Sequence, residues 1–147
     1  MVGEGSVSKE KTASPGGAEM SYHYSKIVES SFDEAIDLVT AALAVEGFGV
    51  LTDIDIKATM RKKLDVDFRP YRILGACNPG FAYKALQAED KIGAMLPCNV
   101  VVQQLEDGRV EVSAVDPMAS MQAVESEALG EIATSVADKL KRVVDGL

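Results

Sequence analysis

Residues 75–80 (Gly-Ala-Cys-Asn-Pro-Gly) place a thiol where a predicted strand ends and a predicted helix begins. Asn78 and Pro79 are typical of the N-cap and the first position of a helix. Backbone N–H groups at a helix start favour anions, and they make a neighbouring thiol easier to ionise. Gly80, in the first turn, would let a ligand approach the backbone closely. The pattern indicates that a small anionic or soft ligand binds around Cys77.

Two further residues belong to this candidate ligand-binding site. Cys98 opens a later predicted strand, and if that strand neighbours the strand of Cys77, the two thiols face each other at one end of the sheet. They would then form a reversible disulfide or half of a soft-metal site, but a closed zinc site needs four ligands. Lys84 lies beyond the first turn of the helix and reaches an anion only if the chain folds suitably. His23, the one histidine, is not tied to the thiols by spacing.

Each of these features has a simpler structural interpretation. Asn-Pro is a good helix cap in any protein, and many cysteines are small buried apolar residues. A lysine in the position of Lys84 is more often a solvated helix residue. Basic residues gather in one part of this acidic sequence, and this basic concentration consists of Arg61, Lys62, Lys63, Arg69 and Arg72. We interpret it as a charged helix end with exposed strand positions rather than as a phosphate or carboxylate site.

Other motifs give little support for an enzyme. The sequence has no motif for a nucleotide-binding loop, a nucleophile elbow or a zincin helix. Its histidine does not lie in a recognisable catalytic-triad motif. Three methionines flank the predicted hairpin region, Met95, Met118 and Met121, and methionines suit a ligand pocket or a dimer face as well as a core. An enzyme is therefore the less favoured class, and the sequence names no cofactor.

Bulk composition is that of one folded domain. The chain has 147 residues, 47% of them apolar, and a net charge of −8, which argues against a general binder of nucleic acid or anionic membranes. No signal peptide and no apolar run of membrane-spanning length is visible. Two cysteines imply no disulfide framework, so we expect a cytoplasmic protein. Residues 1–19 are expected to be a disordered leader or an extension ahead of a natural start at Met20.

Periodicity and turn residues predict the elements that position these side chains. Ser31 and Glu34 form a capping box, which predicts the start of a helix. Gly47 suits the left-handed position that follows the end of this helix. Further helices are expected at 55–64 and 79–88, as a short turn after Asp116, and as a long C-terminal helix. Residues 89–97 are expected to be a loop. Strands are predicted at 22–28, 48–53, 71–77, 98–105 and 109–115.

The order of elements predicts the fold class. Strands and helices follow one another as β-α-β-α-β-α-β-β-α, and the hairpin around Gly108 favours antiparallel pairing. The simplest packing is a single, mainly antiparallel sheet with its two longest helices on one face, which is an α+β fold.

Several motifs together resemble the DUF302 family of small prokaryotic proteins. The resemblance rests on Asn78-Pro79, on Leu96-Pro97-Cys98 and on Asp116-Pro117, and it covers about residues 20–147. It implies an α+β domain related to one half of the TATA-binding protein, with extra helices, and a homodimer. It implies no catalytic residues, and fold likeness carries no DNA-binding function with it.

Three function classes remain open from the sequence. The first is a binding or sensory module, which we expect to be dimeric, with a small ligand near Cys77. The second is a thiol-dependent redox or soft-metal-handling protein that uses Cys77 and Cys98. The third is an interaction domain without a small-molecule site.

Overall fold

A computed structural model describes residues 21–147 of the chain. The leader predicted for residues 1–19 lies outside this range. The elements, in chain order, are β2 (His23–Val28), α1 (Phe32–Val45), β3 (Gly49–Asp55), α2 (Ile56–Leu64), β4 (Tyr71–Cys77), α3 (Pro79–Ala88), η2 (Asp90–Met95), β5 (Cys98–Gln104), β6 (Val110–Val115), α4 (Pro117–Ser120) and α5 (Glu127–Asp145).

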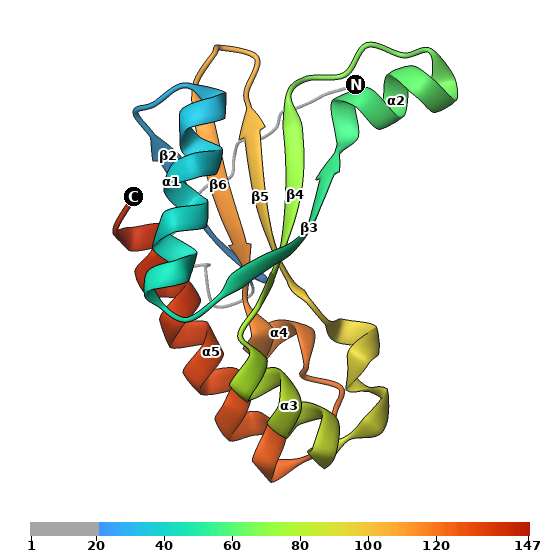
Figure 1. Cartoon of the computed structure of the whole chain (residues 1–147), viewed down its shortest axis with the longest axis vertical. Coiled ribbons are helices and arrows are strands. Elements are labelled where there is room, and N and C mark those ends of the chain that lie inside the picture. Colours follow the sequence, from blue (N-terminus) through green and yellow to red (C-terminus); the bar gives the residue numbers. More distant parts are fainter. Residues whose placement is uncertain (1–20) are drawn as a thin grey trace.

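The five strands form one sheet in the order β2-β6-β5-β4-β3 (Figure 1). Every neighbouring pair is antiparallel, which confirms the predicted α+β fold with a mainly antiparallel sheet. β3 and β2 are the edge strands. The register between β3 and β4 shifts at residues 50–52, and such a bulge bends an edge strand.

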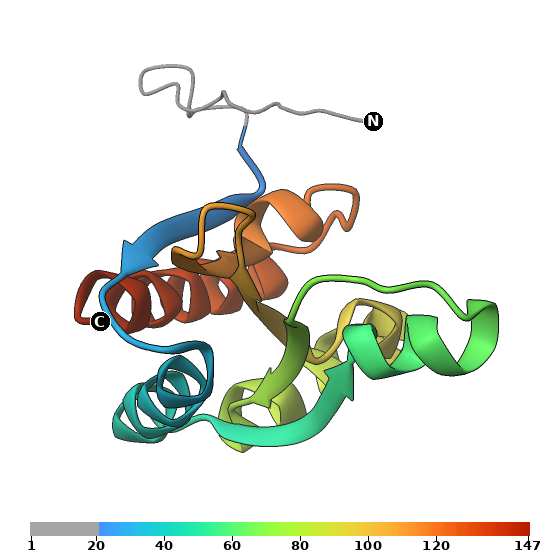
Figure 2. The ribbon, with the colours of Figure 1, turned by 90° about the horizontal axis from the view of Figure 1, so that it is seen from above.

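Helices α1 and α5 lie side by side against one face of the sheet (Figure 2). The side chains between them and the sheet are apolar and buried, and they form the main core. On the opposite face, Ile73 and Val101 are cross-strand partners that are only half-buried. The largest fully buried members of the main core are Leu43, Leu74, Leu140, Val39, Val100, Val102, Val112 and Val144.

The start of α1 is fixed by the predicted capping box. The backbone N–H of Glu34 donates to Ser31 Oγ at 3.1 Å, and the Ser31 N–H donates to Glu34 Oε1 at 3.1 Å. Beyond the end of α1, Gly47 has a φ of 89°, a conformation that favours glycine. The turn at Gly47 sends the chain directly into β3 beside the site described below.

The segment before β5 differs from its prediction. Residues 89–97 were expected to form a loop, but Asp90–Met95 form the 3₁₀ helix η2. The Glu89 side chain accepts a hydrogen bond from the Lys91 N–H at 3.2 Å and starts this helix. A short 3₁₀ helix has no 3.6-residue period, so the apolar pattern gives no signal for it.

Two of the five residues of the basic concentration, Arg61 and Arg72, pair with acidic residues of the same region. Arg61 Nη1 lies 2.9 Å from Asp65 Oδ1, and Arg72 Nε donates to Asp53 Oδ1 at 2.7 Å. These carboxylates offset the positive charge, which favours the structural interpretation over an anion site. In addition, no helix within residues 21–147 is long and apolar enough to cross a membrane.

Candidate functional site

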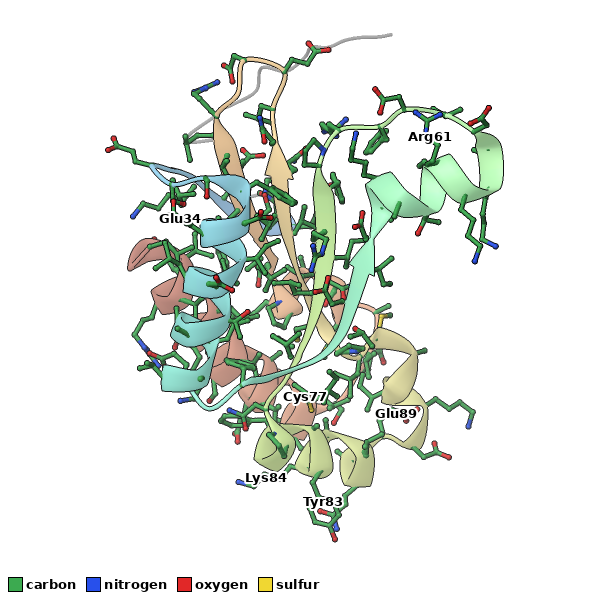
Figure 3. The ribbon with its side chains drawn as sticks, turned by 45° about the horizontal axis from the view of Figure 1, so that its top comes forward. Glu34, Arg61, Cys77, Tyr83, Lys84 and Glu89 are labelled. Carbon is green, nitrogen blue, oxygen red and sulfur yellow. The ribbon has the colours of Figure 1, made fainter. Side chains whose placement is uncertain are left out.

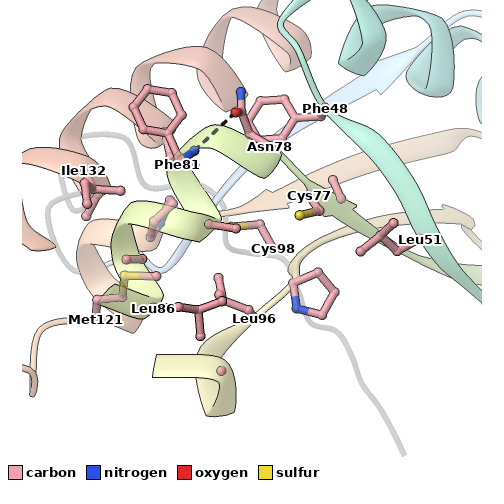
Figure 4. A pocket seen from close by; sticks show the side chains of 18 residues that line it. Phe48, Leu51, Cys77, Asn78, Phe81, Leu86, Leu96, Cys98, Met121 and Ile132 are labelled. Carbon is pink, nitrogen blue, oxygen red and sulfur yellow. Dashed lines mark hydrogen bonds between the residues drawn. The ribbon is translucent and has the colours of Figure 1, made fainter. Parts of the chain in front are cut away.

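A cavity of about 280 Å³ lies where β4 and β5 end, against α3, α4 and α5 (Figure 4). Its walls are almost entirely apolar side chains. The lining residues are Phe48, Leu51, Ala76, Cys77, Asn78, Phe81, Ala82, Ala85, Leu86, Gly93, Leu96, Pro97, Cys98, Pro117, Met121, Ile132, Ala133 and Val136. Its volume is near the lower end of the range of about 300–1,000 Å³ that is typical of ligand pockets.

Both cysteines contribute to this wall. Cys98 pairs with Ala76 in the antiparallel ladder of β4 and β5, so the strands are neighbours and Cys77 lies diagonally across from Cys98. Cys77 is half-buried and Cys98 is buried, and both are free thiols. The two strands thus bring both thiols to one end of the sheet, beside the same cavity.

Asn78 joins the thiol-bearing strand to α3. It is the N-cap of α3, with Pro79 in the first turn, as predicted. The Phe81 N–H donates to Asn78 Oδ1 at 3.5 Å, and Asn78 Nδ2 donates to the Glu46 carbonyl at 3.4 Å. These contacts turn the amide of Asn78 toward the backbone of α3 and of the α1–β3 connection, and so fix one rim of the cavity.

The remaining predicted site residues lie outside the cavity wall. Lys84 and its neighbour Tyr83 point away from the body of the protein (Figure 3). Lys84 and Glu131 line an adjoining, open depression that shares Phe81 and Ile132 with the cavity, and Pro79 and Gly80 line neither. The structure therefore brings together Cys77, Asn78 and Cys98, and separates them from Lys84.

Close packing against Gly75 of β4 positions Pro97, which forms part of the cavity wall. A β-carbon added to Gly75 would overlap Thr52 Oγ1 and lie 2.7 Å from Cγ of Pro97. Pro97 lines the cavity, and only a residue without a side chain leaves room for its ring against β4.

Within residues 21–147, the side chains that line the cavity include no lysine, arginine or histidine, so none of them offers a charged partner to an anion. Burial, with a smaller contribution from the charge of an ionised Cys77, raises the pKa of the Cys98 thiol from its ordinary value of 9.0 to about 11. Within residues 21–147 no three side chains of the metal-binding types cluster together, so the two thiols stand without further metal ligands.

The raised pKa of Cys98 makes stability fall at alkaline pH. The folded state keeps the thiol proton up to about pH 11, whereas the unfolded chain loses it near 9.0. The stability that the protonated Cys98 thiol contributes is fully present below pH 9 and is lost as the pH rises toward 11. Across this window, the free energy of unfolding of the wild-type protein should therefore fall by about 2 kcal/mol more than that of Cys98→Ala. Urea unfolding under reducing conditions measures this; parallel pH profiles would contradict it.

Most of the apolar wall was not anticipated from the sequence. Phe48 lies just before β3, whereas Phe81 and Leu86 lie on α3, and only the fold brings these two segments together. Met121 was named as suited to a pocket and does line the cavity, whereas Met95 and Met118 do not. The cavity-facing residues Ile132 and Val136 belong to the apolar stripe of α5, whose period cannot distinguish core from pocket.

Comparison with known proteins identifies the family. A family model described as a domain of unknown function, DUF302, matches residues 24–147. The chain is also similar to an uncharacterized conserved DUF302 protein from Bacillus stearothermophilus, whose crystal structure it matches with a TM-score of 0.78 and 31% identity over 84% of this chain and 96% of that one. No curated protein matches. The chain belongs to the DUF302 family.

Proposed function

We propose that this domain binds a small, neutral, apolar molecule in the cavity between the ends of β4 and β5 and helices α3 and α5. The observation that carries the proposal is the apolar lining of a cavity of about 280 Å³. Burying apolar surface contributes roughly 25 cal/mol per Å², so such a wall supplies binding energy without charge pairing.

The same lining favours a neutral ligand over the anion suggested by the helix start. The carboxamide of Asn78 already accepts the hydrogen bond of the Phe81 N–H, in the first turn of α3. A carboxylate in the cavity would lose water and gain no cationic side chain among the lining residues.

A fluorescent probe tests this function directly. N-Phenyl-1-naphthylamine, a neutral apolar dye, should bind the full chain and be displaced by 1-octanol at concentrations about tenfold or more below those of octanoate, because only octanoate carries a charge into the cavity. Fluorescence titration measures both competitions. Equal displacement by the two competitors would contradict a neutral apolar site.

A matched pair of variants locates the binding. Ala82 on α3 lines the cavity, so Ala82→Phe should fill part of it and weaken probe binding about tenfold or more. Ala88, at the exposed end of the same helix, lies outside that wall, and Ala88→Phe should bind the probe as wild type does. Equal binding by both variants would place the dye elsewhere.

Other expectations from the sequence accompany this function as predictions. The homodimer implied by the family resemblance is tested by sedimentation velocity at micromolar concentration, where a single monomer species would contradict it. A cytoplasmic binding or sensory module without nucleic-acid or membrane partners also stays a prediction.

A further inference from the structure

The two thiols are the only strongly nucleophilic side chains among the residues that line the cavity. Both face it from neighbouring strands, as the labelled side chains of Figure 4 show. In a regular strand, Cys77 and Ala76 would point to opposite sides of the sheet. Cys77 ends β4, however, and both residues line the same cavity as Cys98.

The register gives the spacing of the two cysteines. Neighbouring strands lie about 4.8 Å apart and a strand rises about 3.4 Å per residue, so the diagonal Cα–Cα separation of Cys77 and Cys98 is roughly 6 Å. Disulfides join Cα atoms that are about 4.4–6.8 Å apart. The Cα–Cα separation of the two cysteines therefore falls within the range that a disulfide spans.

The two thiols differ in access. Cys98 is only 8% exposed, whereas Cys77 is half-buried at the junction of β4 with α3. A reagent that enters the cavity therefore meets the more accessible Cys77 first, at the junction of β4 with α3. Cys98, held in apolar surroundings, is suited to react second.

We propose that Cys77 and Cys98 are a reactive thiol pair that reduces an apolar organic hydroperoxide held in the cavity. The inference rests on the proposed function, because the same apolar wall binds the organic part of the hydroperoxide. It deepens that function by naming the chemical class of one substrate.

The reaction balances with the hydroperoxide as the only oxidant. Cys77 sulfur attacks the terminal oxygen; an S–O bond forms, the O–O bond breaks, and the alkoxide leaves as the alcohol with the thiol proton. The sulfur of Cys98 then attacks the Cys77 sulfenic acid, an S–S bond forms, and the hydroxyl leaves as water with the proton of Cys98. Two thiols and one hydroperoxide yield one disulfide, one alcohol and one water.

Oxidation of the full chain by two peroxides tests the proposal. Cumene hydroperoxide, which has an apolar body, should form the intramolecular disulfide about tenfold or more faster than hydrogen peroxide, because its apolar group is buried in the cavity. Intact mass and loss of both free thiols report the product. Ala82→Phe should remove the preference for cumene hydroperoxide, and Ala88→Phe should keep it.

Cysteine variants establish the order of the two steps. Cys98→Ser, or Cys98→Ala if the serine perturbs the core, should stop at a sulfenic acid on Cys77 that dimedone traps. Cys77→Ser should leave Cys98 unoxidised. Equal rates with both peroxides, or oxidation of Cys98 without Cys77, would overturn the thiol-pair proposal. If the dye still binds and octanol still displaces it, that failure leaves the apolar binding function intact, whereas loss of dye binding removes both.

Discussion

Leu43→Ala should lower the free energy of unfolding by about 2–5 kcal/mol, the range measured for removing a fully buried leucine side chain. Leu43 is completely buried in the main core, on the face of α1 that packs against the sheet. The cost combines lost burial with the hole left behind, which a close-packed interior refills only in part. Its carbonyl also accepts the N–H of Phe48 at 2.9 Å, so the loss falls next to a wall of the cavity. Chemical denaturation followed by circular dichroism measures the change.

Leu38→Ala is the matched control for this substitution. Leu38 lies on the same helix, loses the same atoms, and is 50% exposed. Its loss should cost roughly 1 kcal/mol or less, because little apolar surface returns to water. Equal destabilisation by the two variants would contradict the burial of Leu43 beneath α1.

Gly75→Ala should destabilise the protein by about 3 kcal/mol, the upper part of the range for overpacking a filled site. The added methyl group meets Thr52 Oγ1 and the ring of Pro97, which lies 2.7 Å from the new carbon. The ring is rigid, so the strand ends must separate to relieve the contact. Because Pro97 lines the cavity, dye binding should weaken as well.

Two further variants separate this clash from a general effect of alanine. Gly49→Ala on β3 places its β-carbon in open space, with nothing within 4 Å, and should be close to neutral. Adding Thr52→Ala to Gly75→Ala removes one of the two obstacles and should recover part of the lost stability. A neutral Gly75→Ala would show that Pro97 does not pack against β4.

Local signals were sufficient to predict most of the fold. The capping box at Ser31, the Asn-Pro start of α3 and the hairpin at Gly108 each act within a few residues, so they can be identified from sequence alone. The antiparallel sheet followed from the final hairpin and the order of elements. The 3₁₀ helix η2 escaped prediction because its hydrogen-bond pattern carries no apolar period.

The candidate site was predictable only in part. Cys77 and Asn78 were identified because a strand-to-helix junction has a local signature, and the register then placed Cys98, the first residue of β5, diagonally across from Cys77. The apolar wall was not identified, since a pocket residue such as Ile132 has the same spacing as a core residue on α5. Lys84 lies outside the cavity wall, and its position in the helix could not reveal which side of α3 faces the body.

The cavity walls extend from Phe48, next to the first helix, to Val136 in the last one. A molecule seated there touches segments that are remote along the chain, so it favours the folded state as a whole. At a concentration one hundred times its dissociation constant it would add about 2.7 kcal/mol to the unfolding free energy. The melting temperature can therefore serve as a search tool: neutral compounds fractionated from cell extracts can be ranked by how far each one raises it, before any biological role is assigned.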